Sequence, residues 1–173
     1  MRATGSSFQR PTDVFRVNPT VFWVTLLLAL VLQKVLPLKI SLARFFDFPL
    51  LAMIYFALVR RDEIFGIFLG AGLGLLQDAF SHGNIGFFGM SKALIGYLAA
   101  SAGIKLDLER IMGRLVTAGI LVFIHDLFLQ VIKHALLESV PPFKPLNLLI
   151  SLMVNVALGL ILFQILDRFK QPA

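Results

Sequence analysis

The sequence predicts an all-α, polytopic membrane protein with about six transmembrane helices. Hydrophobic residues make up 58% of its 173 residues, charged residues only 15%, and the mean hydropathy is +0.86. A soluble domain contains about 45–50% apolar and about 25% charged residues. Apolar runs long enough to cross a bilayer recur along almost the whole chain. The composition therefore excludes a soluble globular protein.

Several chemical classes are also disfavoured. The chain has no cysteine, which excludes disulfides, thiolate metal sites and cysteine nucleophiles. It contains no phosphate-binding loop, HExxH or GxSxG motif, and no His, Asp and Glu cluster at metal-ligand spacing. The net charge of +6 fits loops that contact anionic lipid headgroups better than a nucleic-acid surface. We expect no enzymatic activity, no cofactor, no metal and no nucleic-acid partner.

Six apolar segments define the predicted spans of a single transmembrane domain over residues 19–168. A basic tail over residues 1–18 precedes this domain and a short tail over 169–173 follows it. The segments cover residues 20–36, 45–59, 64–80, 87–104, 115–137 and 146–166. The first is interpreted as a retained span, because its length and flanking residues fit a cleaved signal peptide poorly. The second is short beside the roughly 20 residues of a perpendicular crossing, so it is either stretched or re-entrant.

Charges, glycines and prolines mark the ends of these segments. Gln33 and Lys34 lie near the end of the first and can extend to the interface. The charged run 60–63 ends the second, a glycine-rich turn over 81–86 separates the third from the fourth, and a proline-containing loop precedes the sixth.

The basic residues predict how the spans are oriented. Six spans place both termini on one side of the membrane, and cytoplasmic loops carry an excess of Lys and Arg. If the termini are cytoplasmic, that side holds 10 of the 16 basic residues: Arg2, Arg10, Arg16, Arg60, Arg61, Lys105, Arg110, Arg114, Arg168 and Lys170. We therefore expect a multi-pass protein of the inner membrane with both termini in the cytoplasm.

Two charges inside the third and fourth spans lie at similar predicted depth. A charge at the bilayer centre costs about 2.5–3.5 kcal/mol on insertion scales, so it normally faces the protein interior and has a partner. Asp78, next to Gln77, and Lys92 lie on antiparallel segments joined by a short turn. We expect an Asp78–Lys92 ion pair, which either holds the hairpin together or serves substrate or proton binding.

The fifth and sixth spans each carry a polar stripe. Asp126, Gln130, Lys133 and His134 share one face of the fifth span, while His125 points about 100° away and is expected to be a packing residue. The sixth span has small and polar residues every four positions: Asn147, Ser151, Asn155 and Gly159. We expect the two stripes to face each other. They form either the wall of a polar cavity or an interhelical hydrogen-bond network.

Glycines form a candidate partner-binding surface on the third span. Gly66, Gly70 and Gly74 make two overlapping GxxxG steps, which allow another backbone to approach closely. The approaching helix belongs either to a partner protein or to the same chain.

The predicted hairpin resembles the central hairpin of the rod shape-determining protein MreD family. The third span ends in Gly74–Ser81 (GLLQDAFS), a glycine-punctuated turn with Gly83 and Gly86 follows, and the fourth span contains Ala93–Leu98 (ALIGYL). The family pattern is a span ending in a G-L-L-x-D-type run, such a turn, and a span ending in Tyr-Leu.

The resemblance implies a non-enzymatic inner-membrane component of the machinery that builds the lateral peptidoglycan wall of rod-shaped bacteria. The implied partners are the single-pass protein MreC, the glycosyltransferase and transpeptidase of wall elongation and, less directly, actin-like MreB filaments. The family is also thought similar in fold to the substrate-binding components of energy-coupling-factor vitamin transporters, which have six helices around an outward-facing cavity.

Three functional hypotheses follow. The leading one is a membrane scaffold that binds partner transmembrane helices. The alternative is a solute-binding component of a vitamin-type transporter that uses the polar stripes of the fifth and sixth spans. The least favoured is an intramembrane enzyme using His125 and Asp126, since no catalytic motif supports it.

Overall fold

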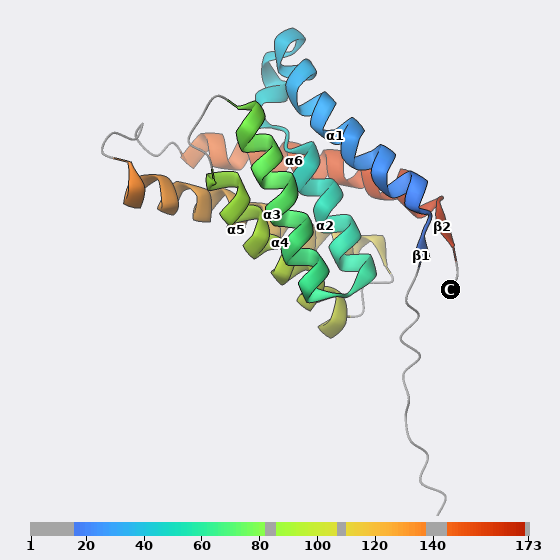
Figure 1. Cartoon of the computed structure of the whole chain (residues 1–173). Coiled ribbons are helices and arrows are strands. Elements are labelled where there is room, and N and C mark those ends of the chain that lie inside the picture. The colour runs from blue at the N-terminus through green and yellow to red at the C-terminus, as the bar shows by residue number, and fades with distance from the viewer. Residues whose placement is uncertain (1–15, 82–85, 107–109, 138–144, 172–173) are drawn as a thin grey trace, which may run out of the picture.

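The chain folds into a bundle of helices, shown by a computed structural model that describes residues 16–81, 86–106, 110–137 and 145–171 (Figure 1). The α-helices in these ranges are α1 (Pro19–Lys39), α2 (Phe48–Arg60), α3 (Glu63–Phe80), α4 (Phe87–Lys105), α5 (Ile111–Leu136) and α6 (Pro145–Asp167). A 3₁₀ helix, η1 (Ser41–Phe45), joins α1 to α2. Each predicted span matches one α-helix. All but α2 are long and apolar enough to cross a membrane, which confirms the predicted fold class.

The ends of the helical domain lie next to each other. Strand β1 (Arg16–Val17) pairs antiparallel with β2 (Lys170–Gln171) just before α1 and just after α6. Parts of the chain interpreted from the sequence lie outside the described residues: the tail over 1–15, the turn over 82–85, residues 107–109, the loop over 138–144 and residues 172–173 of the C-terminal tail.

Helix α2 lies at the centre of the bundle. Every residue from Phe48 to Val59 is buried, and α2 contacts each of the other α-helices. Its 13 residues rise only about 20 Å, less than the roughly 30 Å of a bilayer core. The short second segment is therefore a buried central helix, which the link through η1, Phe46 and Asp47 joins to α1.

Local sequence explains where α2 begins and ends. The Asp47 carboxylate accepts a hydrogen bond from the Leu50 backbone N–H at 3.0 Å, and Pro49 occupies the first turn, where no intrahelical donor is needed. Arg61 ends the helix in the left-handed conformation, with φ of 56°. Asp62 then caps α3 through the Phe65 N–H, so a very short link reverses the chain.

The glycines of α3 pack against α4. These two helices form the most extensive helix–helix contact in the described chain and run side by side in Figure 1. A Cβ atom added to Gly66, Gly70 or Gly74 would overlap a backbone carbonyl of α4. The glycine surface is therefore covered by α4. The sequence left open whether the approaching helix belongs to a partner protein or to the same chain, and in the structure it belongs to the same chain.

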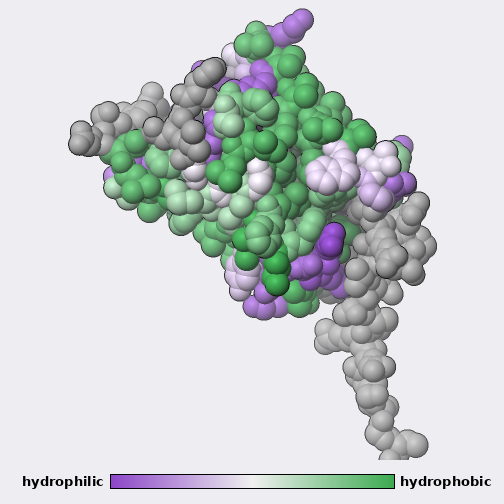
Figure 2. All heavy atoms as spheres, viewed as in Figure 1, coloured by the Kyte–Doolittle hydropathy of each residue, from purple (hydrophilic) through white to green (hydrophobic). Residues whose placement is uncertain are grey.

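Helices α1 and α6 form much of the outer surface. Only Leu26 and Ala29 of α1 are buried, and α6 buries Asn155, Gly159, Phe163 and Leu166. Figure 2 shows that hydrophobic residues cover most of the visible face, with hydrophilic residues gathered toward its ends. This distribution suits a protein surrounded by lipid.

Candidate functional site: a polar network inside the bundle

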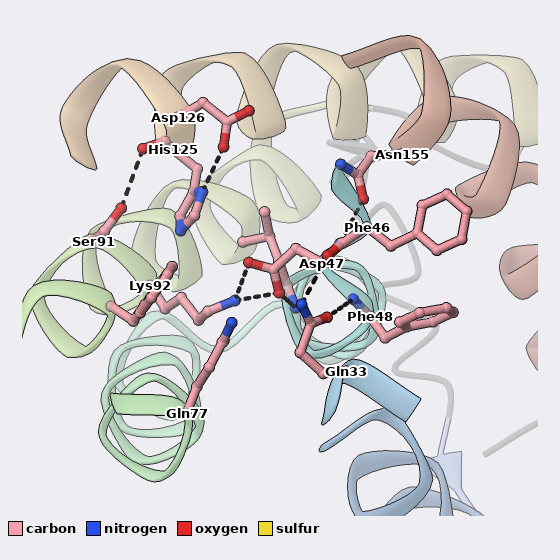
Figure 3. A network of polar contacts seen from close by, with 12 residues as sticks. Gln33, Phe46, Asp47, Phe48, Gln77, Ser91, Lys92, His125, Asp126 and Asn155 are labelled. Atoms are coloured by element: carbon pink, nitrogen blue, oxygen red, sulfur yellow. Dashed lines mark hydrogen bonds and ion pairs between the residues drawn. The ribbon is translucent and has the colours of Figure 1, made fainter. Parts of the chain in front are cut away.

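A network of polar side chains, here called the polar core, occupies the interior of the bundle (Figure 3). It draws on every α-helix or its cap. Its members are Gln33 of α1, Asp47 before α2, Gln77 of α3, Ser91 and Lys92 of α4, His125 and Asp126 of α5, and Ser151 and Asn155 of α6.

Lys92 and Asp47 form the ion pair at the centre of the polar core. Lys92 Nζ lies 2.6 Å and 2.7 Å from the two carboxylate oxygens of Asp47. The lysine side chain is completely buried, and the aspartate side chain is 13% exposed. Two charges removed from water in this way require close pairing, which the bidentate geometry supplies.

The expected Asp78–Lys92 ion pair is wrong. The Asp78 carboxylate instead accepts hydrogen bonds from the backbone N–H groups of Gly86, Phe88 and Gly89, at 2.9–3.2 Å. The start of a helix has free N–H groups and a partial positive charge, and Gly86 offers no side chain to satisfy them. Asp78 therefore caps α4 and joins the end of α3 to the start of α4, while Lys92 finds its partner at the start of α2.

The non-helical link before α2 is held by side chains from α1 and α6. Gln33 donates to the Phe46 carbonyl at 2.9 Å and accepts from the Phe48 N–H at 3.0 Å. Asn155 accepts from the Asp47 N–H at 2.9 Å and donates to the Phe45 carbonyl at 2.8 Å. Backbone groups at membrane depth cannot be satisfied by lipid, so these two amides allow the irregular segment to lie inside the bundle.

The stripes of α5 and α6 meet at one point. Ser151 Oγ donates to Asp126 Oδ2 at 2.8 Å, and His125 Nδ1 lies 3.1 Å from Asp126 Oδ1. Beyond this point the stripes diverge, since Asn155 turns to the link before α2 and Gly159 packs near Leu51 and Leu115. The interhelical network is therefore formed in part.

Other predicted residues lie at the margin of the polar core. Asn147 is exposed in the first turn of α6, and the half-buried Gln130 side chain makes no hydrogen bond to the described residues. His134 Nδ1 contacts the Gln130 carbonyl, and Lys133 Nζ lies 5.9 Å from the Phe88 ring centroid. Gln77, by contrast, is a buried member of the polar core, and its Oε1 atom has no partner in the described chain.

A second buried ion pair joins the start of α5 to the end of α6. Arg114 donates to both carboxylate oxygens of Asp167, at 2.6 Å and 2.7 Å, and the Tyr55 hydroxyl donates to the same carboxylate at 3.0 Å. The sequence pattern groups Arg114 with the basic residues of the cytoplasmic side and does not indicate this cluster. Tyr55 was the one indication of the cluster in the sequence, because it lies within the apolar segment 45–59 and a buried tyrosine hydroxyl usually finds a polar partner.

Ser91 and His125 lie close together in the polar core, but not as a catalytic pair. Ser91 donates to the His125 backbone carbonyl, not to its ring, so these residues do not form a nucleophile–base pair. Among the described residues, no group of three or more His, Asp or Glu side chains could hold a metal ion.

Described residues line a pocket beside the polar core and a groove on the outer surface of the bundle. A pocket of about 160 Å³ lies between α1, α3 and α4, and Gln33, Lys34 and Gln77 contribute to its lining. A larger groove of about 500 Å³ lies between α5 and α6 and is lined by apolar residues.

Exposed apolar helices around a buried polar network define a polytopic membrane protein whose ionisable residues bind helices to each other. A family model described as rod shape-determining protein MreD matches residues 15–169, so the chain belongs to the MreD family. Comparison with curated proteins and with solved structures found no match. The expected similarity to vitamin-transporter components thus remains a prediction.

Proposed function

We propose that this chain is a non-enzymatic scaffold of the wall-elongation machinery. It binds an MreC-like single-pass protein and the elongation glycosyltransferase and transpeptidase, and it communicates less directly with MreB filaments. Membership of the MreD family already connects the chain with rod-shape determination. The binding of these particular partners is what we add to that connection.

The polar core is the observation that supports a scaffold best. Gln33, Asp47, Lys92 and Asn155 are engaged with one another or with backbone atoms of neighbouring segments. Such contacts fix the relative positions of helices that apolar packing in lipid would hold only weakly. A bundle fixed in this way presents partner helices with a defined outer surface.

The transporter alternative finds less support. Pockets for small molecules usually measure about 300–1,000 Å³ and combine an apolar lining with a few polar groups. The pocket beside Gln33 and Gln77 is smaller, and the larger groove lacks polar lining residues. We therefore do not assign a solute to this chain.

The proposed location is the inner membrane, with both termini in the cytoplasm. The pairing of β1 with β2 places the two ends of the helical domain together, which agrees with an even number of crossings. Arg60, the last residue of α2, and Arg61, which follows it, agree with a cytoplasmic location for the link to α3.

Co-purification combined with genetic complementation tests this proposal. The tagged chain is expressed with the MreC-like protein of the same organism, and an unrelated single-pass protein serves as the control. We expect selective retention of the MreC-like protein and restored rod shape in cells that lack the chromosomal copy. Unchanged cell shape after deletion of the gene, together with equal retention of the control protein, would overturn the proposal.

A further inference from the structure

The small pocket beside the polar core brings together a buried acceptor, a cation and two aromatic rings. It has a volume of about 160 Å³ and lies between α1, α3 and α4. Lys34 lines it from α1, Gln77 and Phe80 line it from α3, and Phe88 lines it from α4. The pocket is therefore a place where a group from outside the chain can meet the polar core.

Gln77 supplies this pocket with a hydrogen-bond acceptor that needs a donor. The residue is only 6% exposed, and its Oε1 atom has no partner in the described chain. Buried polar atoms normally have a hydrogen-bond partner, because an unsatisfied group loses the water that it would otherwise bind. A hydroxyl group that enters the pocket would supply the missing donor.

Lys34 gives the pocket a positive charge. It is exposed and makes no hydrogen bond or ion pair with the residues that the structure describes. A second cation, Lys133 of α5, lies 5.9 Å from the Phe88 ring centroid. The carboxylate of Asp78, next to Gln77 in the sequence, is buried and accepts three backbone N–H groups. These charges favour an anion over a cation as the occupant.

The pocket lies close to the ends of its helices. The 21 residues of α1 rise about 31 Å, which is the thickness of a bilayer core. Lys34 is five residues before the end of α1, or about 7 Å, and Gln77 is three residues before the end of α3, or about 5 Å. A lysine at this depth can extend its ammonium group to the interface, where lipid phosphates lie.

An anionic phospholipid matches these features. Its acyl chains can lie along exposed apolar side chains on both sides of the pocket: Leu27 and Val31 of α1 and Leu76 and Phe80 of α3. Its phosphate can accept a charge-assisted hydrogen bond from Lys34. The pocket is smaller than typical sites for whole small molecules, but a lipid inserts only its headgroup.

We infer that this pocket binds the headgroup of an anionic phospholipid that carries a hydroxyl group, as phosphatidylglycerol does. Lys34 pairs with the phosphate, and a headgroup hydroxyl donates to Gln77 Oε1. The lipid thereby reaches the polar core through α3. This inference goes beyond the proposed function, and it does not depend on which proteins the chain binds.

Native mass spectrometry of the full chain in detergent tests the site with three lipids. Phosphatidylglycerol has a negative charge and hydroxyl groups, phosphatidylethanol has the same charge without a hydroxyl, and phosphatidylcholine has neither a net charge nor a hydroxyl. We expect the chain to bind phosphatidylglycerol about fivefold more tightly than phosphatidylethanol, because one hydrogen bond is lost. Phosphatidylcholine should bind most weakly. Equal affinity for all three lipids would overturn the inference.

Two variants separate the charge from the amide. Lys34→Gln should lower the affinity for both anionic lipids about threefold. Lys39→Gln is its control, because Lys39 is exposed on the same helix but does not line the pocket. Gln77→Met should abolish the preference for phosphatidylglycerol over phosphatidylethanol, whereas Gln130→Met on α5 should keep it. This preference is a ratio within one variant, so a change in stability does not imitate it.

Three further results would overturn the inference. An unchanged lipid preference in Gln77→Met would mean that a neighbouring group of the chain, such as Lys92, satisfies Oε1. Equal effects of Lys34→Gln and Lys39→Gln would mean that the lysines attract lipid without a specific site. Displacement of phosphatidylglycerol by an equal concentration of soluble glycerophosphoglycerol would show that the pocket takes a free solute and not a lipid.

Discussion

Lys92 of α4 donates to both carboxylate oxygens of Asp47, the residue that caps α2, across 45 positions of sequence. The same aspartate accepts the Leu50 N–H, and its own N–H donates to Asn155. One residue therefore joins a helix cap, an ion pair and an interhelical hydrogen bond. The start of the central helix is the point on which α4 and α6 converge.

Removing one charge of the Lys92–Asp47 ion pair should lower the free energy of unfolding more than removing both charges. Lys92→Met and Asp47→Asn should each destabilise the protein by about 3–5 kcal/mol, since each leaves a buried charge unpaired. The double variant should recover part of that loss, because Asn at position 47 can still cap α2. Unfolding of the purified variants in detergent measures the effect. Harmless single variants, or rescue by Asp78→Lys with Lys92→Asp, would contradict this assignment.

Two glycines of α3 should respond oppositely to the same substitution. Gly70→Ala places a methyl group against the Lys92 carbonyl, whereas Gly72 has open space around its added Cβ. We expect Gly70→Ala to lower the unfolding temperature. Gly72→Ala should keep it or raise stability by up to about 1 kcal/mol, because alanine favours helix. Equal behaviour of the two variants in a thermal-shift assay would show that α4 does not depend on the close approach.

Replacing Asn155 should lower the yield of folded protein far more than replacing Asn147 on the same helix. Asn155→Leu leaves the Asp47 N–H and the Phe45 carbonyl without their partner, and each unsatisfied buried group costs about 1–3 kcal/mol. Asn147 is exposed, so Asn147→Leu should leave folding unchanged. The yield of monodisperse protein after size-exclusion chromatography is the measurement. A normal yield for Asn155→Leu would mean that the link before α2 does not need this amide.

Reporter fusions at Asp62 and Lys144 should report opposite sides of the membrane. Asp62 lies between α2 and α3, whereas Lys144 immediately precedes α6. The distribution of basic residues predicts a cytoplasmic reporter at Asp62 and an external one at Lys144. Paired alkaline phosphatase and fluorescent protein fusions distinguish the two sides. The same side for both positions would reject the six-span topology.

Much of the fold could be predicted from the sequence because membrane helices depend on local properties. A run of apolar residues of sufficient length specifies a helix in lipid, since its backbone must satisfy its own hydrogen bonds. The glycine steps of α3 likewise indicated a close helix contact. Their spacing could not distinguish α4 from a partner helix, because both would present the same kind of surface.

The sequence by itself determined that this chain is an all-helical membrane protein and a member of the MreD family. Only the tertiary structure decided the partners of its polar residues. Asp78 and Lys92 lie on adjacent helices, yet Asp78 meets the free N–H groups at the start of α4, and Lys92 meets Asp47 from a distant segment. Arg114 and Asp167 are likewise 53 residues apart. Partner choice depends on which groups packing brings within hydrogen-bond distance, and that proximity is a property of the assembled bundle.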